Sequence, residues 1–139
     1  MRSHTASHII SQVIHKETGA LITGNQLNLD QSRIDFSLDD YDPSKIQEYI
    51  NEANEILKKD LLVTAKFISY DEAAKDPELS RLAKGLPNIK ELRILNIGDF
   101  DIQADGGTHV HSTKEVGSVT LIKTVNKGKN NRRLYFSLD

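Results

Sequence analysis

Histidines are the residues of this chain whose spacing points most directly to chemistry. His4 and His8 stand four residues apart near the start of the sequence, and His109 follows the pair Gly106-Gly107 much later. Two imidazoles four residues apart lie on one face of a helix. A third imidazole from a distant turn can close a metal site. The pattern predicts a metal site that joins two segments far apart in the chain.

The glycine pair beside His109 brings a candidate second ligand to the same place. Paired glycines permit a tight turn with positive φ, which lets the carboxylate of Asp105 and the imidazole of His109 converge on one point. The chain contains no cysteine, so His, Asp and Glu are the strong side-chain ligands that remain. Any metal site here is therefore expected to use nitrogen and oxygen ligands.

The element expected to position His4 and His8 is a helix over residues 3–17. Its apolar residues recur with helical spacing and form one stripe, and its histidines form a second stripe roughly opposite. When the apolar stripe packs on a core, the histidines turn toward solvent or a cleft. Ser3 is expected to cap the helix start and Gly19 to follow its end. The apolar stripe consists of Ala6, Ile9, Ile10, Val13 and Ile14.

Two further histidines are expected to lie outside the site. His15 shares the helix face of His8 but is too far along the axis for a common ion, since each residue rises about 1.5 Å. His111 is two residues beyond His109, so in an extended segment it faces the other way. We expect His15 to lie on the surface and His111 to be a bystander.

Patterns elsewhere predict an α/β (α+β) fold with a largely antiparallel sheet packed with two main helices. We expect one domain over residues 1–139. The expected elements are a hairpin of 20–29 and 32–38 turning at Asp30-Gln31, a helix over 43–59, a strand over 61–70, a short helix and loop over 71–85, one or two strands over 93–103 interrupted at Gly98-Asp99, and strands over 116–125 and 133–138 joined across 126–131.

Composition excludes several classes of protein. The net charge of -2 argues against broad binding to DNA or other nucleic acid. No apolar run approaches the roughly 20 residues that span a bilayer, and the start does not read as a signal peptide. We expect a cytoplasmic protein without a membrane partner. From Asp105 onward, however, six Lys or Arg face three acids, which indicates either a local phosphate-contacting patch or an ordinary solvated hairpin.

Several short segments occur in the same order in a known family. Taken together they resemble the editing domain of alanyl-tRNA synthetase, and in particular its short free-standing form, the AlaX family of alanyl-tRNA editing proteins. The resemblance covers nearly the whole chain. The matching segments are 4–8 (HTASH), 32–37 (SRIDFS), 97–100 (IGDF), 106–110 (GGTHV), 113–117 (TKEVG) and 132–133 (RR).

The resemblance implies the editing-domain fold of alanyl- and threonyl-tRNA synthetases and an ATP-independent hydrolase that serves translation fidelity. Its substrate would be tRNA(Ala) mischarged with serine, with glycine as a further candidate. One zinc ion per chain would be held by His4, His8 and His109. The family has a cysteine where this chain has Asp105, which either binds zinc through oxygen or holds a ligand or water beside it.

Ester hydrolysis at such a site needs an activated water or a polarised carbonyl, and zinc can supply either. We therefore expect a metal-bound water to act, and no protein nucleophile is assigned. Serine is expected to be selected by a polar group that satisfies its hydroxyl. The substrate-binding candidates are Thr5, Ser7, Thr23, Asn25, Gln26, Gly106 and Gly107, of which Thr23 and Gln26 rank first among the polar side chains. The tRNA-binding candidates are Lys114, Lys127, Lys129, Arg132 and Arg133.

Two alternatives stay open at this point. Loss of the family cysteine at Asp105 could leave a metal-free module that binds aminoacyl-tRNA without turnover. A related editing hydrolase could also act on another mischarged tRNA, such as Ser-tRNA(Thr). The sequence does not determine the oligomeric state.

Overall fold

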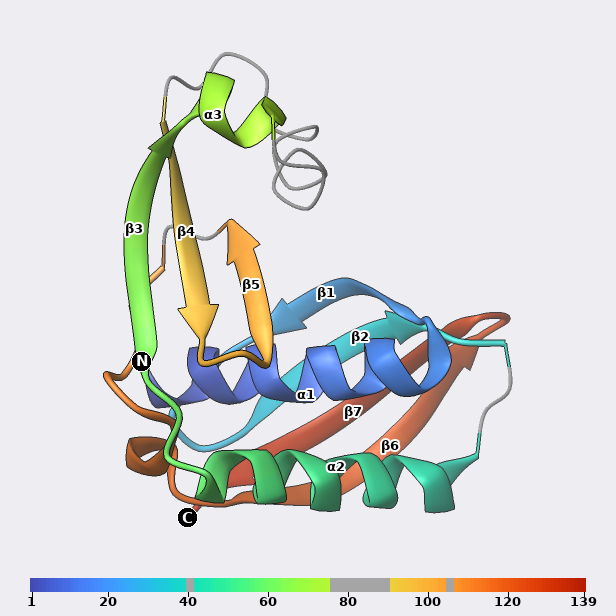
Figure 1. Ribbon diagram of the computed structural model, residues 1–139. Helices are drawn as coiled ribbons and strands as arrows, with labels where there is room; N and C mark the ends of the chain where they lie inside the picture. Colours follow the sequence, from blue (N-terminus) through green and yellow to red (C-terminus); the bar gives the residue numbers. More distant parts are fainter. Residues whose placement is uncertain (40–41, 76–90, 105–106) are drawn as a thin grey trace.

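The computed structural model describes residues 1–39, 42–75, 91–104 and 107–139 (Figure 1). It confirms an α+β fold with two long helices. The helical elements are α1 (Arg2–Thr18), α2 (Pro43–Lys58), α3 (Tyr70–Lys75) and the 3₁₀ helix η1 (Thr113–Val116). The strands are β1 (Leu21–Gln26), β2 (Ser32–Ser37), β3 (Val63–Ser69), β4 (Glu91–Ile97), β5 (Asp101–Ala104), β6 (Val119–Gly128) and β7 (Asn131–Leu138).

The strands of the described residues form two antiparallel sheets. One has the order β1-β2-β7-β6 and the other the order β3-β4-β5. Figure 1 shows α1 and α2 side by side on one face of the four-stranded sheet, with the three-stranded sheet above the N-terminal half of α1. The antiparallel pairing is confirmed, but the single sheet expected from the sequence is divided in two.

Helix α1 has the predicted extent and the predicted apolar face. All five residues of the expected apolar stripe are buried in the core. Gly19 ends the helix in the left-handed conformation, with φ 76°, and its N–H donates to the His15 carbonyl at 2.7 Å. The predicted capping role of Ser3 is wrong: the helix starts one residue earlier, with Met1 at the N-cap position. The Ser3 hydroxyl instead donates to the Asn28 carbonyl at 3.4 Å.

Helix α2 begins as its sequence indicates. The Asp42 side chain accepts hydrogen bonds from the Ser44 hydroxyl and from the Ser44 N–H, and these two bonds lower the pKa of Asp42. Its apolar stripe packs into the same core as α1 and the inner face of the four-stranded sheet. None of the helices in the described part of the chain has the length and apolar character needed to cross a bilayer.

The two hairpin connections of the four-stranded sheet differ from expectation. Strand β1 ends at Gln26, so its loop to β2 is longer than the predicted turn at residues 30–31. The Ser32 hydroxyl closes this loop by bonding the N–H and the carbonyl of Asn28. Between β6 and β7 the connection is shorter than expected, because both strands extend into it and Asn130 adopts a positive φ of 59°.

Candidate metal centre

Three histidines meet between α1 and the segment that precedes η1. His4 and His8 lie one turn apart on α1, with their Nε2 atoms 3.3 Å from each other. The His109 ring stacks on the His4 ring with centroids 4.2 Å apart. One ligand atom from each of the three half-buried residues lies within 4.8 Å of the other two. The predicted convergence of these histidines is therefore present in the structure.

The Thr5 hydroxyl contacts the imidazole ring of His109. Its side chain is fully buried, and its Oγ1 lies 2.9 Å from Nδ1 of His109. The same oxygen accepts a hydrogen bond from the Val110 N–H at 3.4 Å. Since this contact engages Nδ1, Nε2 becomes the nitrogen through which His109 would bind a metal. The buried Thr5 therefore lies behind the ring of His109. From the sequence, Thr5 was predicted to contact the substrate.

Asp101 supports His8 from the strand β5, and sequence reasoning missed it. Its Oδ2 lies 3.7 Å from Nδ1 of His8, and the carboxylate is almost fully buried. Gln103 donates to the same carboxylate oxygen at 3.1 Å. A carboxylate behind a metal-binding histidine is a recurrent arrangement in zinc sites. The sequence signal was only an ordinary strand pattern, which does not separate this aspartate from a surface residue.

The turn before His109 is only partly described. Asp105 and Gly106 lie outside the described residues, so the fourth ligand stays a prediction. The Gly107 carbonyl accepts a hydrogen bond from Nη1 of Arg93 on β4 at 2.8 Å. This bond ties Gly107 to the three-stranded sheet. His15 and His111 are exposed and lie outside the cluster, as expected.

The remaining substrate-binding candidates fall into two groups. Ser7 is buried within α1, which places it among core residues. Thr23, Asn25 and Gln26 are exposed along β1, the edge strand of the four-stranded sheet. Strand β1 follows α1 directly in the chain, and the first helical turn contacts the loop that follows β1. The exposed side chains of β1 therefore remain the candidates for hydrogen bonds to the substrate.

Among the tRNA-binding candidates, Arg132 needs correction. Its side chain is buried, and its guanidinium donates to Asn126 Oδ1, the Gly128 carbonyl and the Asp39 carbonyl. These bonds hold the β6–β7 hairpin to the end of β2, so Arg132 is a structural residue. The other candidate in the pair, Arg133, is half-buried. Exposed lysines at positions 114, 127 and 129 remain candidates for phosphate contacts.

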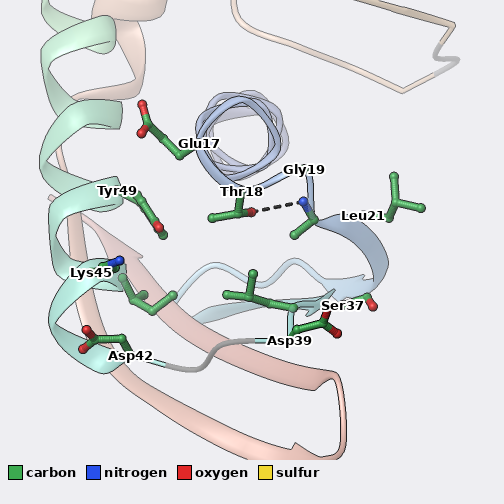
Figure 2. Close-up of a pocket in the computed structure, with 12 residues that line it drawn as sticks. Glu17, Thr18, Gly19, Leu21, Ser37, Asp39, Asp42, Lys45 and Tyr49 are labelled. Carbon is green, nitrogen blue, oxygen red and sulfur yellow. Dashed lines mark hydrogen bonds between the residues drawn. The ribbon is translucent and has the colours of Figure 1, made fainter.

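A separate pocket lies at the far end of the two long helices. It has a volume of about 710 Å³ and lies between the end of α1, the start of α2, the start of β1 and the end of β2. Figure 2 shows Glu17, Lys45 and Tyr49 around it. Burial, followed by the negative charge of Glu17, raises the pKa of Tyr49. No histidine lines this pocket among the residues described, so it is distinct from the metal centre.

Comparisons with known proteins agree with the resemblance seen in the sequence. Residues 92–135 match the family described as the threonyl and alanyl tRNA synthetase second additional domain. The chain is 51% identical over 140 residues to the alanyl-tRNA editing protein AlaX-M of Methanosarcina barkeri. It is 49% and 44% identical to the AlaX-M proteins of Methanosarcina mazei and Saccharolobus solfataricus. These matches cover 99% of this chain and 56–58% of the relatives' length.

Proposed function

We propose that this chain, which is similar over 99% of its length to alanyl-tRNA editing proteins, hydrolyses the ester bond of tRNA(Ala) mischarged with serine. The reaction releases serine and leaves the tRNA intact. The observation that carries the proposal is the meeting of His4, His8 and His109, which come from segments far apart in the sequence. Gly107 and the polar edge strand β1 offer backbone and side-chain groups for a small acyl group.

The donor set fits a zinc ion. Three imidazoles are a ligand set that leaves a position open for a substrate or a further ligand. Thr5 engages Nδ1 of His109 at 2.9 Å, which leaves Nε2 of that ring for a metal, and the Asp101 carboxylate faces Nδ1 of His8 at 3.7 Å, a separation longer than a hydrogen bond. When bound, zinc supplies Lewis acidity, which activates water or polarises the ester carbonyl.

The residues around the histidines carry the other tasks. His4 lies in the first turn of α1, where the positive end of the helix dipole favours the neutral imidazole that binds metal. On β1, the exposed Thr23 and Gln26 offer hydrogen-bonding groups for a serine hydroxyl. A site that satisfies a hydroxyl rejects a methyl group strongly, because its polar groups would be left unpaired. Such a site therefore spares correctly charged Ala-tRNA(Ala).

The decisive experiment measures deacylation of Ser-tRNA(Ala) and Ala-tRNA(Ala), with and without a strong chelator. We expect loss of serine alone, abolished by chelation and restored by zinc. Hydrolysis of neither substrate by zinc-loaded protein would overturn the proposal and favour a binding module without turnover. A preference for Ser-tRNA(Thr) over Ser-tRNA(Ala) would instead favour an editing hydrolase for a different tRNA.

A further inference from the structure

The outer face of the four-stranded sheet has a chemistry unlike that of its inner face. Alternate residues of β2 and β7 point inward to the core, and those between them point outward. The register places Arg33 of β2, Tyr135 of β7 and Lys123 of β6 in one row across the sheet. The next row contains Asp35 and Arg133.

Cationic side chains surround the aromatic ring of Tyr135. Nζ of Lys123 lies 4.7 Å from the ring centroid, and Nη1 of Arg133 donates to the tyrosine hydroxyl at 3.3 Å. The hydrogen bond from Arg133 and the positive charges of Lys123 and Lys127 lower the pKa of Tyr135. The one acid in these two rows, Asp35, is paired with Arg133, with Oδ1 2.6 Å from Nε, and its Oδ2 lies 4.0 Å from Nε of Arg33, so one carboxylate faces two guanidinium groups. The surface around the ring is therefore positive.

A small cleft lies beside this ring. Its lining is polar and comes from the β1–β2 loop and the adjoining strands: Gln26, Asn28, Gln31, Ser32, Arg33 and Tyr135. On the helix side of the loop, the Ser3 hydroxyl donates to the Asn28 carbonyl. Ser3 directly precedes His4 in the first turn of α1. Asn28 therefore lines the cleft and also contacts the residue that precedes His4.

We propose that this face, which we call the Tyr135 surface (Arg33, Lys123, Lys127 and Tyr135), binds the single-stranded 3′ end of the tRNA. Sheet aromatics that stack on unpaired bases, flanked by cations on the phosphates, are typical of single-strand recognition. Tyr135 stacks on a base, and the lysines and Arg33 contact phosphates. The inference rests on the proposed function, because it gives the path by which the acylated end crosses the β1–β2 loop to the histidines.

Binding of a labelled acceptor-stem hairpin tests the proposal by fluorescence anisotropy at several salt concentrations, with and without its single-stranded 3′ overhang. We expect the Lys123→Ala, Lys127→Ala variant to bind more weakly and to lower the slope of log K against log salt by about 1 to 2. Tyr135→Ala should weaken binding of the overhang RNA about 5- to 100-fold, and Tyr135→Phe should retain it. The matched control is Lys58→Ala, Lys59→Ala, since both lysines are exposed at the end of α2.

Three results would overturn the proposal. The first is a salt slope for the Lys123, Lys127 variant equal to that of the control. The second is equal loss with and without the overhang in Tyr135→Ala. The third is a polyglutamate peptide that competes as well as the RNA. Deacylation separates this proposal from the proposed function. If the variants hydrolyse the substrate at limiting tRNA as fast as the wild type, only the role of the Tyr135 surface is contradicted. If the wild type binds the overhang through Tyr135 but does not hydrolyse the ester, only the editing activity is contradicted.

Discussion

The histidines of the cluster depend on neighbours that are not ligands themselves. Asp101 lies behind His8, and Thr5 lies behind His109, each on the Nδ1 side of the ring. A partner at Nδ1 fixes the orientation and tautomer of an imidazole, so that Nε2 can present its lone pair to a metal. Substitution of either partner therefore tests positioning separately from ligation.

We expect Asp101→Asn to weaken zinc binding about 10- to 100-fold. The amide keeps the shape of the side chain but loses the negative charge that faces the His8 ring. Competition with a chromophoric chelator measures the Kd for zinc. Asp99→Asn is the matched control, because Asp99 is exposed in the turn before β5. Equal affinities for Asp101→Asn and the wild type would remove Asp101 from the metal centre.

Thr5→Val should lower zinc affinity and stability together, and Thr5→Ser should restore most of both. Valine keeps the volume but leaves the His109 ring nitrogen and the Val110 N–H without the oxygen they share. An unsatisfied buried polar group costs about 1–3 kcal/mol. Urea unfolding with chelator present measures the stability, and chelator competition measures the affinity. If Thr5→Val changed only the preference for serine, Thr5 would be the substrate contact predicted from the sequence.

At the scale of elements, helices were easier to predict from the sequence than sheets. The apolar stripes of α1 and α2 repeat over several turns, so both helices lie within one or two residues of their predicted bounds. Strand alternation also located the strands, but it carries no information on which strands pair across the fold. The division between β1-β2-β7-β6 and β3-β4-β5 could therefore not be predicted.

Arg132 illustrates a second limit of sequence patterns. An arginine pair in a basic hairpin looks like a phosphate contact, yet alternation along β7 turns Arg132 inward and Arg133 outward. Only the structure shows that carbonyls of Gly128 and Asp39 accept hydrogen bonds from the buried guanidinium. The residue type gives the positive charge of Arg132, but the burial of its side chain decides that this charge contacts backbone carbonyls.

Arg132→Ala should therefore destabilise the fold by about 1.5–3 kcal/mol, the range for hydrogen bonds to charged groups. Its acceptors on the β6–β7 hairpin and after β2 would lose their donor. Urea unfolding measures the effect, with Lys127→Ala as a control on the exposed side of the same hairpin. A variant as stable as the wild type but weaker in RNA binding would restore Arg132 as a phosphate contact.

At the scale of the whole molecule, the sequence predicted which histidines meet but not how they are held. The helical spacing of His4 and His8, and the glycine turn before His109, were sufficient to predict a joint site. Asp101 escaped notice because its role depends on the placement of β5 beside α1, a contact between elements distant in the chain. Contacts of that kind follow from the packing of layers, which local patterns do not specify.

Because its ligands come from segments far apart in the chain, a zinc ion at this centre should stabilise the fold as a whole. At a free zinc concentration about 100 times its Kd, the free energy of unfolding should rise by about 2.7 kcal/mol. Urea unfolding with zinc or with chelator measures this difference. We expect His109→Ala to abolish the zinc effect and His111→Ala to retain it, since His111 is exposed and lies outside the cluster. A wild-type midpoint that did not respond to zinc would mean that the three histidines do not bind the ion in the folded chain.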